Sequence, residues 1–528
     1  MTTPFKLTYS TMFDPPPELH ARFETSVATL RSQAGGEHPM LIGGRDERAR
    51  VQFEVKSPID RRHVLGRFEV GDATHANAAI AAARTAFAEW SATAWTERVA
   101  LLRRAAALIE TRVYELGAAL SLEVGKNRME SLGEAQETAD LISYYCDQME
   151  ANDGFVTPML RDPLSGFASD NTSVLKPYGV WLVIAPFNFP MALAGGPAAA
   201  AMVAGNAVVF KPSSATPWSG RLLALALRDA GLPAGVFNFV TGSGANLGEA
   251  LIAHEAVAGV TFTGSYDVGM QLYRRFANGR WPRPCIAEMG GKNAAIVSRH
   301  ADVAAAATGI MRSAFGLSGQ KCSACSRVYV EQSVFADFVA ALHRRVEKTS
   351  VGDPTHKDVY MGPVIDAKAV ARYEDAVAIV HALDADGAIV AGGERLDHDD
   401  LAHGHFVAPT IARAPLDHPL WSRELFVPLV LVAPVDSIDE AFARANASDF
   451  ALTAGFYGDD GETERFFDVI DVGVAYANRP QGATTGAWPG YQPFGGWKGS
   501  GSTGKAAGSR YYLPQYLREQ SQTRVRRL

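Results

Sequence analysis

The stretch from Pro177 to Phe210 contains no charged residue, so any fold of this chain has to shield it from water. It is longer than the roughly 20 residues that cross a bilayer as a helix. Three prolines, Pro186, Pro190 and Pro197, interrupt the stretch, and alanine is its most frequent residue. We therefore predict a buried strand, a loop and a buried helix here, and not a membrane span.

Short apolar runs alternate with helical patterns along most of the chain. The runs occupy 179–185, 207–213, 235–242, 257–265, 293–298, 326–331, 387–393 and 426–435, and helical spacing marks 73–90, 96–125 and 219–231. Strands that alternate with helices of this length indicate parallel βαβ units. We predict two α/β domains whose boundary lies near Met289.

Composition excludes several classes of protein. The net charge is −7, whereas a general nucleic-acid binder needs a basic surface. Four cysteines in 528 residues are too few for a disulfide framework and indicate a reducing compartment. The first residues lack the basic and apolar segments of a secretion signal, so we expect a cytoplasmic protein. Residues 1–37 show little patterning and are interpreted as an N-terminal extension.

The segment GQKCSACS, residues 319–326, contains two of the cysteines. A zinc site would need further ligands at suitable spacing, so we expect no metal. A redox pair and a buried inert cysteine are two other interpretations. Lys321 precedes Cys322 and would favour its thiolate form, which makes a nucleophilic cysteine the remaining interpretation. The segment alone does not decide among them.

Two further motifs place polar residues in apolar settings. In APFNFP, residues 185–190, Asn188 is either a turn residue or an amide that donates a hydrogen bond to a developing oxyanion. In EMGGKN, residues 288–293, Glu288 is either a solvated turn residue or a general base beside glycine backbone.

Three turns suit a dinucleotide. Lys211 in the motif KPS lies near the carboxyl end of a predicted strand, where α/β proteins bind ligands. The segments GSGANLG, 242–248, and FTGSYDVG, 262–269, each follow a strand and open a helical pattern. One such glycine motif is weak evidence, and two in one domain are better evidence.

Seven motifs in order along the chain resemble the aldehyde dehydrogenase superfamily. They are APFNFP, KPS, FTGS, EMGG, GQKC, ELF at 424–426 and PFGGWKGSG at 493–501, within a resemblance that extends from about residue 38 to residue 528. The resemblance implies an α/β fold with two doubly wound domains, one for a cofactor and one for catalysis, and a small β extension for oligomerisation. It also implies an NAD(P)-dependent oxidation of an aldehyde to a carboxylate.

The resemblance assigns catalytic roles to Cys322, Glu288 and Asn188. Cys322 is implied to attack the aldehyde, and the Asn188 amide and the Cys322 backbone N–H are implied to hold the oxyanion. A hydride then passes to the cofactor, and Glu288 is implied to activate the water that hydrolyses the thioester. Cys325 is implied to be a bystander.

The same resemblance implies where the cofactor binds. The implied residues are Lys211, Ser213, Ser214, Gly242, Gly248, Phe262, Gly264, Ser265, Glu424 and Phe426. Lys211 is implied to bind the adenosine ribose, Ser265 the pyrophosphate, and Glu424 with Phe426 the nicotinamide side. Ser214 stands where many NAD-preferring relatives carry a glutamate, so NAD is expected and NADP is the alternative.

Two segments, GQKCSACSR at 319–327 and TGAWPGYQPFGG at 485–496, are similar to the 1-pyrroline-5-carboxylate dehydrogenases. That subgroup oxidises L-glutamate γ-semialdehyde to L-glutamate in proline catabolism. The implied substrate-binding residues are Phe187, Lys321, Ser323, Gly486, Ala487 and Phe494. Ser323 and two backbone N–H groups, of Gly486 and Ala487, are implied to hold the α-carboxylate, and the two phenylalanines to flank the aliphatic chain.

Some features leave alternatives open. The loop 478–487 is longer than the subgroup's usual loop, so a dehydrogenase of the same fold for another aldehyde is one alternative. A catalytically silent binding or structural protein on this scaffold is another. Glu137 and Asp140 are interpreted as solvated helix surface, with contact to the substrate ammonium group as the alternative.

The resemblance also divides the chain into parts. These are an extension at 1–37, a dinucleotide-binding domain at 38–160 and 180–288, a catalytic domain at 289–489, and an oligomerisation hairpin and C-terminal segment at 161–179 and 490–528. A homodimer or a dimer-based homo-oligomer is expected. We expect a small aldehyde as the other partner, and neither nucleic acid nor a membrane.

Overall fold

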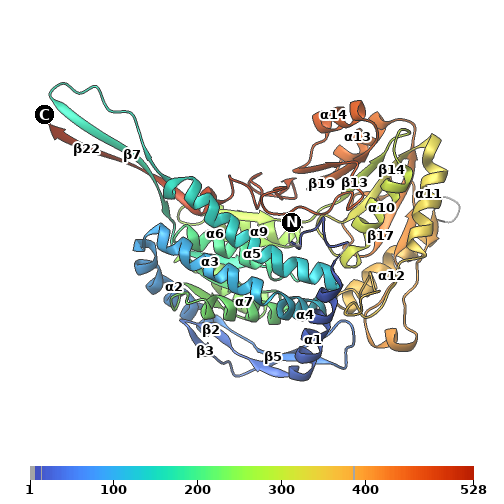
Figure 1. The fold of residues 1–528 in the computed structure, drawn as a ribbon, viewed down its shortest axis with the longest axis horizontal. Coiled ribbons are helices and arrows are strands. Elements are labelled where there is room, and N and C mark those ends of the chain that lie inside the picture. Colours follow the sequence, from blue (N-terminus) through green and yellow to red (C-terminus); the bar gives the residue numbers. More distant parts are fainter. Residues whose placement is uncertain (1–5, 14, 384–386) are drawn as a thin grey trace.

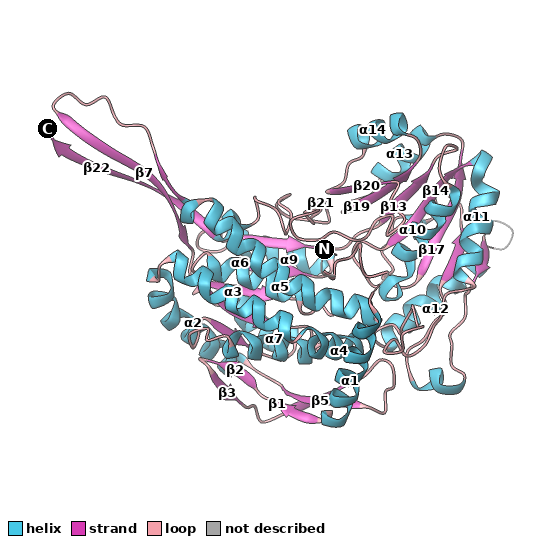
Figure 2. Cartoon of the chain, viewed as in Figure 1, coloured by secondary structure: helices cyan, strands magenta, loops and turns pink. Residues whose placement is uncertain are grey.

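The computed structural model describes residues 6–13, 15–383 and 387–528. Two seven-stranded sheets covered by helices make up the body of the molecule, and an arm of antiparallel strands projects from it (Figure 1, Figure 2). This arrangement confirms the α/β class that the alternating strands and helices predicted.

The first sheet has the strand order β12-β11-β8-β9-β10-β2-β3. Its strands are β2 (Met40–Ile42), β3 (Arg45–Glu47), β8 (Val180–Ile184), β9 (Ala207–Lys211), β10 (Phe237–Phe239), β11 (Val257–Thr263) and β12 (Cys285–Glu288). Strands β8 to β12 run parallel. Because β9 and β11 flank β8 on opposite sides, the strand order reverses there, and a ligand crevice is expected at the carboxyl ends of the strands.

The second sheet has the order β15-β16-β17-β14-β13-β19-β20. Its strands are β13 (Asn293–Val297), β14 (Cys325–Glu331), β15 (Ala388–Ala391), β16 (Thr410–Arg413), β17 (Leu429–Val435), β19 (Thr453–Tyr457) and β20 (Val474–Ala477). All its neighbours are parallel except β15 and β16. The expected boundary near Met289 falls between β12 of the first sheet and β13 of the second.

Two small sheets complete the body. One consists of β1 (Gly36–His38), β5 (Val64–Glu69) and β4 (Gln52–Lys56), and the other pairs β18 (Phe450–Ala451) with β21 (Trp497–Lys498).

Helices cover the faces of both sheets (Figure 2). Those of the first half are α2 (Ala73–Ala92), α3 (Trp95–Thr111), α4 (Val113–Val124), α5 (Arg128–Ala151), α6 (Ala192–Val203), α7 (Pro217–Asp229), α8 (Glu249–Ala253) and α9 (Tyr266–Ala277). Those of the second half are α10 (Val303–Phe315), α11 (Gln332–Val346), α12 (Ala367–His381), α13 (Ile438–Asn446) and α14 (Asp460–Val469). The helical pattern over 96–125 forms two helices, because the backbone leaves helical geometry at Arg112 (φ −98°, ψ 11°).

The uncharged stretch forms strand β8, a loop, helix α6 and strand β9, as its prolines and alanines predicted. Trp181 in β8 is fully buried, and Leu193 is the one residue of α6 that is not buried. The stretch therefore lies inside the protein core. Within the described ranges, no helix is both long enough and apolar enough to cross a membrane.

The expectation of an unpatterned N-terminal extension needs correction, because helix α1 (Pro17–Gln33) forms there. Its buried residues are Leu19, Phe23, Val27 and Leu30. They recur every three or four positions and pack in one cluster with Ala118, Ala119 and Leu122 of α4. Helix α1 has one narrow apolar stripe and is otherwise polar, which explains why the composition of this segment did not indicate a helix.

The arm consists of β6 (Val156–Pro158), β7 (Phe167–Pro177) and β22 (Leu517–Arg527). Strand β7 pairs antiparallel with both neighbours, and its register with β22 runs from Pro177–Leu517 to Phe167–Arg527. Every residue of β22 after Leu517 is exposed. Large apolar side chains on the arm are exposed as well, namely Val156, Met159, Leu160, Leu164, Phe167, Val525 and Leu528.

Candidate active site

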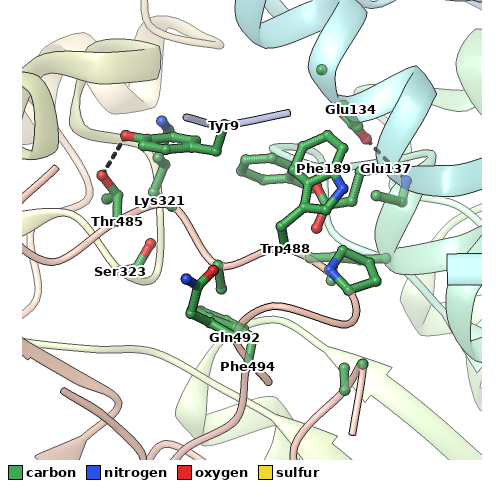
Figure 3. Close-up of a pocket in the computed structure, with 18 of the residues that line it drawn as sticks. Tyr9, Glu134, Glu137, Phe189, Lys321, Ser323, Thr485, Trp488, Gln492 and Phe494 are labelled. Atoms are coloured by element: carbon green, nitrogen blue, oxygen red, sulfur yellow. Dashed lines mark hydrogen bonds between the residues drawn. The ribbon is translucent and has the colours of Figure 1, made fainter. Parts of the chain in front are cut away.

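A cavity lies between helix α5, the segment around Cys322 and the loop that follows β20 (Figure 3). Five residues that the sequence analysis assigned to the substrate line it together with Cys322; they are Lys321, Ser323, Gly486, Ala487 and Phe494. Residues far apart in the sequence, Cys322 among them, therefore line one cavity.

The backbone before Cys322 makes an unusual turn. Leu317 and Ser318 have φ values of 48° and 54°, and Gly319 follows with 67°. Left-handed geometry in residues other than glycine costs about 1–3 kcal/mol each and needs support from its surroundings. The Leu317 N–H donates to Glu130 Oε2 at 3.0 Å, and Ser318 Oγ donates to the Gly362 carbonyl at 2.7 Å. These bonds hold the turn that presents Cys322.

Asn293 and Gly291 of the EMGGKN motif hold the Cys322 backbone from the other side. Asn293 Nδ2 donates to the carbonyls of Cys322 and Ala324 at 2.7 and 2.9 Å. A Cβ on Gly291 would lie 2.2 Å from the Cys322 carbonyl oxygen, so only glycine allows this approach. The motif therefore fixes the position of the nucleophile candidate as well as supplying Glu288.

Burial raises the pKa of the Cys322 thiol to about 12, and the negative charges of Glu424 and Glu288 add to the rise. Lys321 does not offset this effect, because its Nζ forms a buried ion pair with Glu130 Oε1 at 2.5 Å. The expectation that Lys321 favours the thiolate is therefore corrected: its charge is neutralised by Glu130, and the resting thiol is protonated at neutral pH.

Asn188 lies on the loop after β8, at the place where the strand order of the first sheet reverses. Its Nδ2 donates to the Gln320 carbonyl at 2.9 Å, two residues before Cys322. A side-chain amide has two N–H donors, and in the described part of the chain the second one has no partner. Asn188 is therefore held beside Cys322 with a donor left for a ligand.

Glu288 ends strand β12, and its Oε2 accepts a hydrogen bond from the Gly496 N–H at 3.2 Å. Burial raises the pKa of this carboxyl to about 8. The group is therefore mostly protonated at pH 7 and becomes a base above pH 8. Its charge also raises the pKa of Cys322, so the two side chains are close enough to interact electrostatically.

Glu424 and Phe426 line a second pocket together with Gly291 and Lys321. Glu424 Oε1 accepts the Gly291 N–H at 2.8 Å, which ties the ELF motif to the EMGGKN motif. The Phe426 ring makes an edge-to-face contact with Phe187, with ring centroids 5.8 Å apart.

The predicted cofactor residues lie mainly at the carboxyl edge of the first sheet. Ser213 and Ser214 follow β9, Gly242 follows β10, and Gly264 with Ser265 follows β11. Ser214 Oγ donates to the Gly242 carbonyl at 3.3 Å, so the turn after β9 contacts the turn after β10. Ser265 begins helix α9, and a helix N-terminus favours an anionic group such as a phosphate.

Lys211 fits a nucleotide at this edge. Its side chain is buried, and Nζ donates only to the Pro212 carbonyl, at 3.2 Å, among the residues the structure describes. Burial lowers the pKa of this ammonium to about 8. An ammonium group with so few hydrogen-bond acceptors around it is suited to bind ribose hydroxyls. Gly248 lies next to the aliphatic part of the Lys211 side chain. Phe262, by contrast, is buried in the core of the first sheet.

The structure changes one substrate assignment. Phe187 does not line the cavity, because its ring packs on Phe426, whereas Phe189 of the same motif does line it. Alternation along the short loop places Phe187 and Phe189 in different surroundings, and the motif alone did not tell which ring faces the cavity. Trp488 is a second lining aromatic that sequence reasoning missed.

The interpretation of Glu137 and Asp140 as solvated helix surface is also wrong. Glu137 lines the cavity, and burial together with the negative charge of Glu134 raises the pKa of its carboxyl to about 8. Asp140 Oδ2 accepts the Trp488 indole N–H at 2.8 Å and lies 3.1 Å from Lys6 Nζ.

A buried ion pair supports the aromatic wall. Lys126 Nζ lies 2.5 Å from Glu134 Oε2 and 3.3 Å from the centroid of the Phe189 ring. Glu134 Oε1 also accepts the Met191 N–H at 2.8 Å. Helix α5 is thereby joined to the loop that carries both Asn188 and Phe189.

Comparison with known proteins assigns the whole arrangement to one group. The model of the aldehyde dehydrogenase family matches residues 45–521. The chain belongs to the aldehyde dehydrogenase family. This confirms the resemblance that the ordered motifs carried.

Relatives of this aldehyde dehydrogenase family member are similar over nearly their full length. It is 37% identical over 523 residues to 1-pyrroline-5-carboxylate dehydrogenase 2 of Bacillus subtilis, covering 97% of each chain. It is 36% identical to the 1-pyrroline-5-carboxylate dehydrogenase of Geobacillus thermodenitrificans, covering 93% of this chain and 94% of the relative. A crystal structure of 1-pyrroline-5-carboxylate dehydrogenase from Thermus with bound NAD matches with a TM-score of 0.91 at 32% identity and covers all of both chains.

The raised pKa of Glu288 predicts a pH profile. We expect kcat to rise between pH 7 and 9 with an apparent pKa near 8, because only the ionised carboxylate accepts a proton from water. Glu288→Gln should lower kcat by about 10²- to 10⁴-fold and remove this limb. Steady-state rates across pH measure both effects, with the exposed Glu255→Gln as control. A Glu288→Gln profile of unchanged shape would contradict the assignment.

Proposed function

We propose that this protein oxidises L-glutamate γ-semialdehyde, in equilibrium with 1-pyrroline-5-carboxylate, to L-glutamate with NAD as oxidant, as in proline catabolism. One observation carries the proposal: Cys322 lines one cavity together with Ser323, Gly486 and Ala487. The same cavity thus joins a nucleophile to a group of hydrogen-bond donors suited to a carboxylate. Relatives named for this activity cover almost the entire chain.

Both charged ends of the substrate would meet suitable groups. The Ser323 hydroxyl and the N–H groups of Gly486 and Ala487 would donate to the α-carboxylate. Glu137 would face the α-ammonium group, and an ammonium nearby would favour its ionised form. Phe189 and Phe494, which both line the cavity, would flank the aliphatic chain.

The first chemical step is addition of Cys322 to the aldehyde. The thiol gives its proton to solvent water, Sγ bonds to the carbonyl carbon, and the π pair of the C=O bond moves to the oxygen, which becomes an oxyanion. The free N–H of the Asn188 amide and the Cys322 backbone N–H would donate to this oxyanion. The protonated resting thiol makes this deprotonation a costly part of the step.

The second half of the reaction releases the product. A nicotinamide held at this site would supply the hydride acceptor, and loss of a hydride from the carbon bonded to Cys322 Sγ would leave a thioester on Cys322. Ionised Glu288 then takes a proton from water as the water oxygen attacks the thioester carbon. The C–S bond breaks, the Cys322 thiolate takes the proton held by Glu288, and L-glutamate leaves.

The carboxyl edge of the first sheet would hold the dinucleotide. Lys211, Ser213, Ser214, Gly242 and Gly248 would lie along the adenosine half. Ser265 at the start of α9 would face the pyrophosphate, near Phe262 and Gly264, and Glu424 with Phe426 would lie on the nicotinamide side. Ser214 offers no carboxylate to repel a 2′-phosphate, which keeps NADP as the alternative cofactor.

Assembly and location are part of the proposal. Strands β7 and β22 project from the body with exposed apolar side chains, which suits pairing with a second copy in a homodimer or a larger dimer-based assembly. All four cysteines are free, which suits the reducing conditions of the cytoplasm.

A panel of aldehydes tests the proposed substrate. We expect NADH formation with glutamate γ-semialdehyde to have a kcat/KM at least about 10²-fold above that with propanal, because the propanal complex leaves the carboxylate donors unpaired. Benzaldehyde and succinic semialdehyde complete the panel. A higher kcat/KM for another aldehyde of the panel would make that aldehyde the substrate. If no aldehyde of the panel is oxidised, a catalytically silent protein is favoured.

Ser323→Ala tests the carboxylate contact. Loss of one hydrogen bond to a charged group should raise KM for the semialdehyde by about 10-fold, since such bonds contribute roughly 1.5–3 kcal/mol, and should leave KM for propanal nearly unchanged. Steady-state kinetics with both substrates measure the difference. Equal effects on the two substrates would rule out Ser323 as the anchor.

Cys322→Ala tests the nucleophile. Turnover should fall below detection because no other group can form the covalent intermediate, while NAD binding by calorimetry should persist. Cys325→Ala is the matched control, because Cys325 is buried at the start of β14 and should be dispensable for chemistry. Activity retained by Cys322→Ala would overturn the mechanism.

The double variant Phe167→Asp and Val525→Asp tests the arm as an assembly surface. In a dimer these two substitutions place four carboxylates at apolar contacts between the copies. Because burying unpaired charges is costly, the mass measured by sedimentation should shift toward that of the monomer. Val469→Asp, on an exposed position of helix α14 in the body, is the control. An unchanged mass for the arm variant would place the interface elsewhere.

A further inference from the structure

The N-terminal segment, residues 6–13, reaches the cavity from outside both sheets. Tyr9 and Met12 of this segment line the cavity together with Cys322 and Ser323. Figure 3 shows the Tyr9 ring beside Lys321 and Thr485, on the side of the cavity where Ser323 lies. The segment precedes the residues that the family model matches, which begin at residue 45.

Tyr9 packs directly on the loop that supplies Gly486. Its hydroxyl lies 2.6 Å from Thr485 Oγ1, and Thr485 Oγ1 in turn lies 3.0 Å from Ser313 Oγ. Gly486 has a φ of 112°, and a Cβ there would lie 2.3 Å from Tyr9 Cδ1. The ring therefore occupies the space that any larger residue at position 486 would take.

Arg479 joins the ring and the loop. Its guanidinium lies 5.5 Å from the centroid of the Tyr9 ring, and its Nη2 donates to the Gly486 carbonyl at 2.9 Å. Tyr9 is thus held through its hydroxyl, its face and its edge. Each of these contacts fixes the loop as well as the ring.

Further contacts hold the segment on both sides of Tyr9. Lys6 pairs with Asp140, which also accepts the Trp488 indole N–H. On the other side, the Arg312 guanidinium lies 3.8 Å from the centroid of the Phe13 ring, and Phe13 does not line the cavity. Within the segment, Thr11 Oγ1 donates to the Lys6 carbonyl at 2.7 Å.

We propose that Tyr9 is a specificity-determining residue whose ring closes the end of the substrate cavity beyond Ser323 and Gly486 and so limits the length of the aldehyde chain. The Tyr9 hydroxyl additionally positions Thr485 and the neighbouring Gly486. The second role rests on the proposed function, because it concerns the donors assigned to the substrate carboxylate. The length limit does not, because it follows from the shape of the cavity.

The length limit is tested with unbranched aldehydes. Propanal, pentanal and heptanal are compared by kcat/KM in the wild type, Tyr9→Ala, Tyr9→Phe and Phe13→Ala. Tyr9→Ala removes the ring, so the heptanal-to-propanal ratio should rise by about 10-fold or more, which is in the range that apolar pockets achieve for added methylenes. Tyr9→Phe keeps the ring, and Phe13→Ala removes an aromatic ring of the same segment outside the cavity. The Phe13 ring makes an edge-to-face contact with the Tyr9 ring, with centroids 6.0 Å apart, so Phe13→Ala also tests whether loss of a neighbouring contact loosens the segment. Both variants keep an aromatic ring at position 9 and should leave the ratio within about twofold of the wild type.

Two outcomes would overturn the length limit. One is an unchanged ratio in Tyr9→Ala, and the other is an equal rise in Phe13→Ala, which would indicate general loosening of the segment. Circular dichroism and the sedimentation mass of each variant confirm that the fold and assembly are retained.

The positioning role is tested with glutamate γ-semialdehyde. Tyr9→Phe should raise its KM by about 5-fold with kcat within about twofold, because the lost hydrogen bond shifts binding groups and not reacting groups. An equal rise in the KM of propanal would overturn the positioning role. A wild type that does not oxidise the semialdehyde, together with a changed aldehyde-length ratio in Tyr9→Ala, would refute the proposed substrate and leave the length limit standing.

Discussion

The low polarity around Cys322 and Glu288 is the constraint on which the rest of the site depends. Burial raises the pKa values of both groups, to about 12 and about 8, so at pH 7 the thiol is protonated and the carboxyl is mostly protonated. Two uncharged groups can share a small apolar space, whereas two anions there would repel each other strongly. In the proposed mechanism the reactive charge would therefore develop only during the reaction, when the Asn188 amide and the Cys322 backbone N–H would donate hydrogen bonds to it.

The topology of the two sheets explains how such distant residues meet. The first sheet turns its carboxyl edge toward the site, since Glu288 ends β12 and Asn188 follows β8. The second sheet turns its amino edge toward it, since Asn293 begins β13 and Cys322 precedes β14. Ordinary parallel strands thus supply the frame, and the left-handed turn at Leu317 and Ser318 carries the strain of presenting the thiol.

Most of the fold was predictable because strands and helices leave local periodicity in the sequence. Short, mixed strands such as β16 and β19 were missed, since a few residues of modest hydrophobicity carry little signal. Motifs also singled out Cys322, Asn188 and Glu288 as the candidate nucleophile, amide donor and carboxylate. They could not show that Lys321 is neutralised by Glu130, or that Phe189 and not Phe187 faces the cavity, because both facts depend on partners brought in by the tertiary fold. The place of Tyr9 in the cavity was not predicted for the same reason, because its contact with Thr485 joins residues far apart in the sequence.

The pairing of β7 with β22 has a consequence for biosynthesis. The two strands are separated by some 350 positions, as in the contact between Asn171 and Thr523. While the ribosome is still adding the last residues, β7 has no partner on that edge, although the first sheet has already emerged. Nascent chains would therefore carry an open strand edge through most of translation, and closing so long a loop is slow. Chaperone binding during that interval would protect the edge from pairing with neighbouring nascent chains on the same messenger.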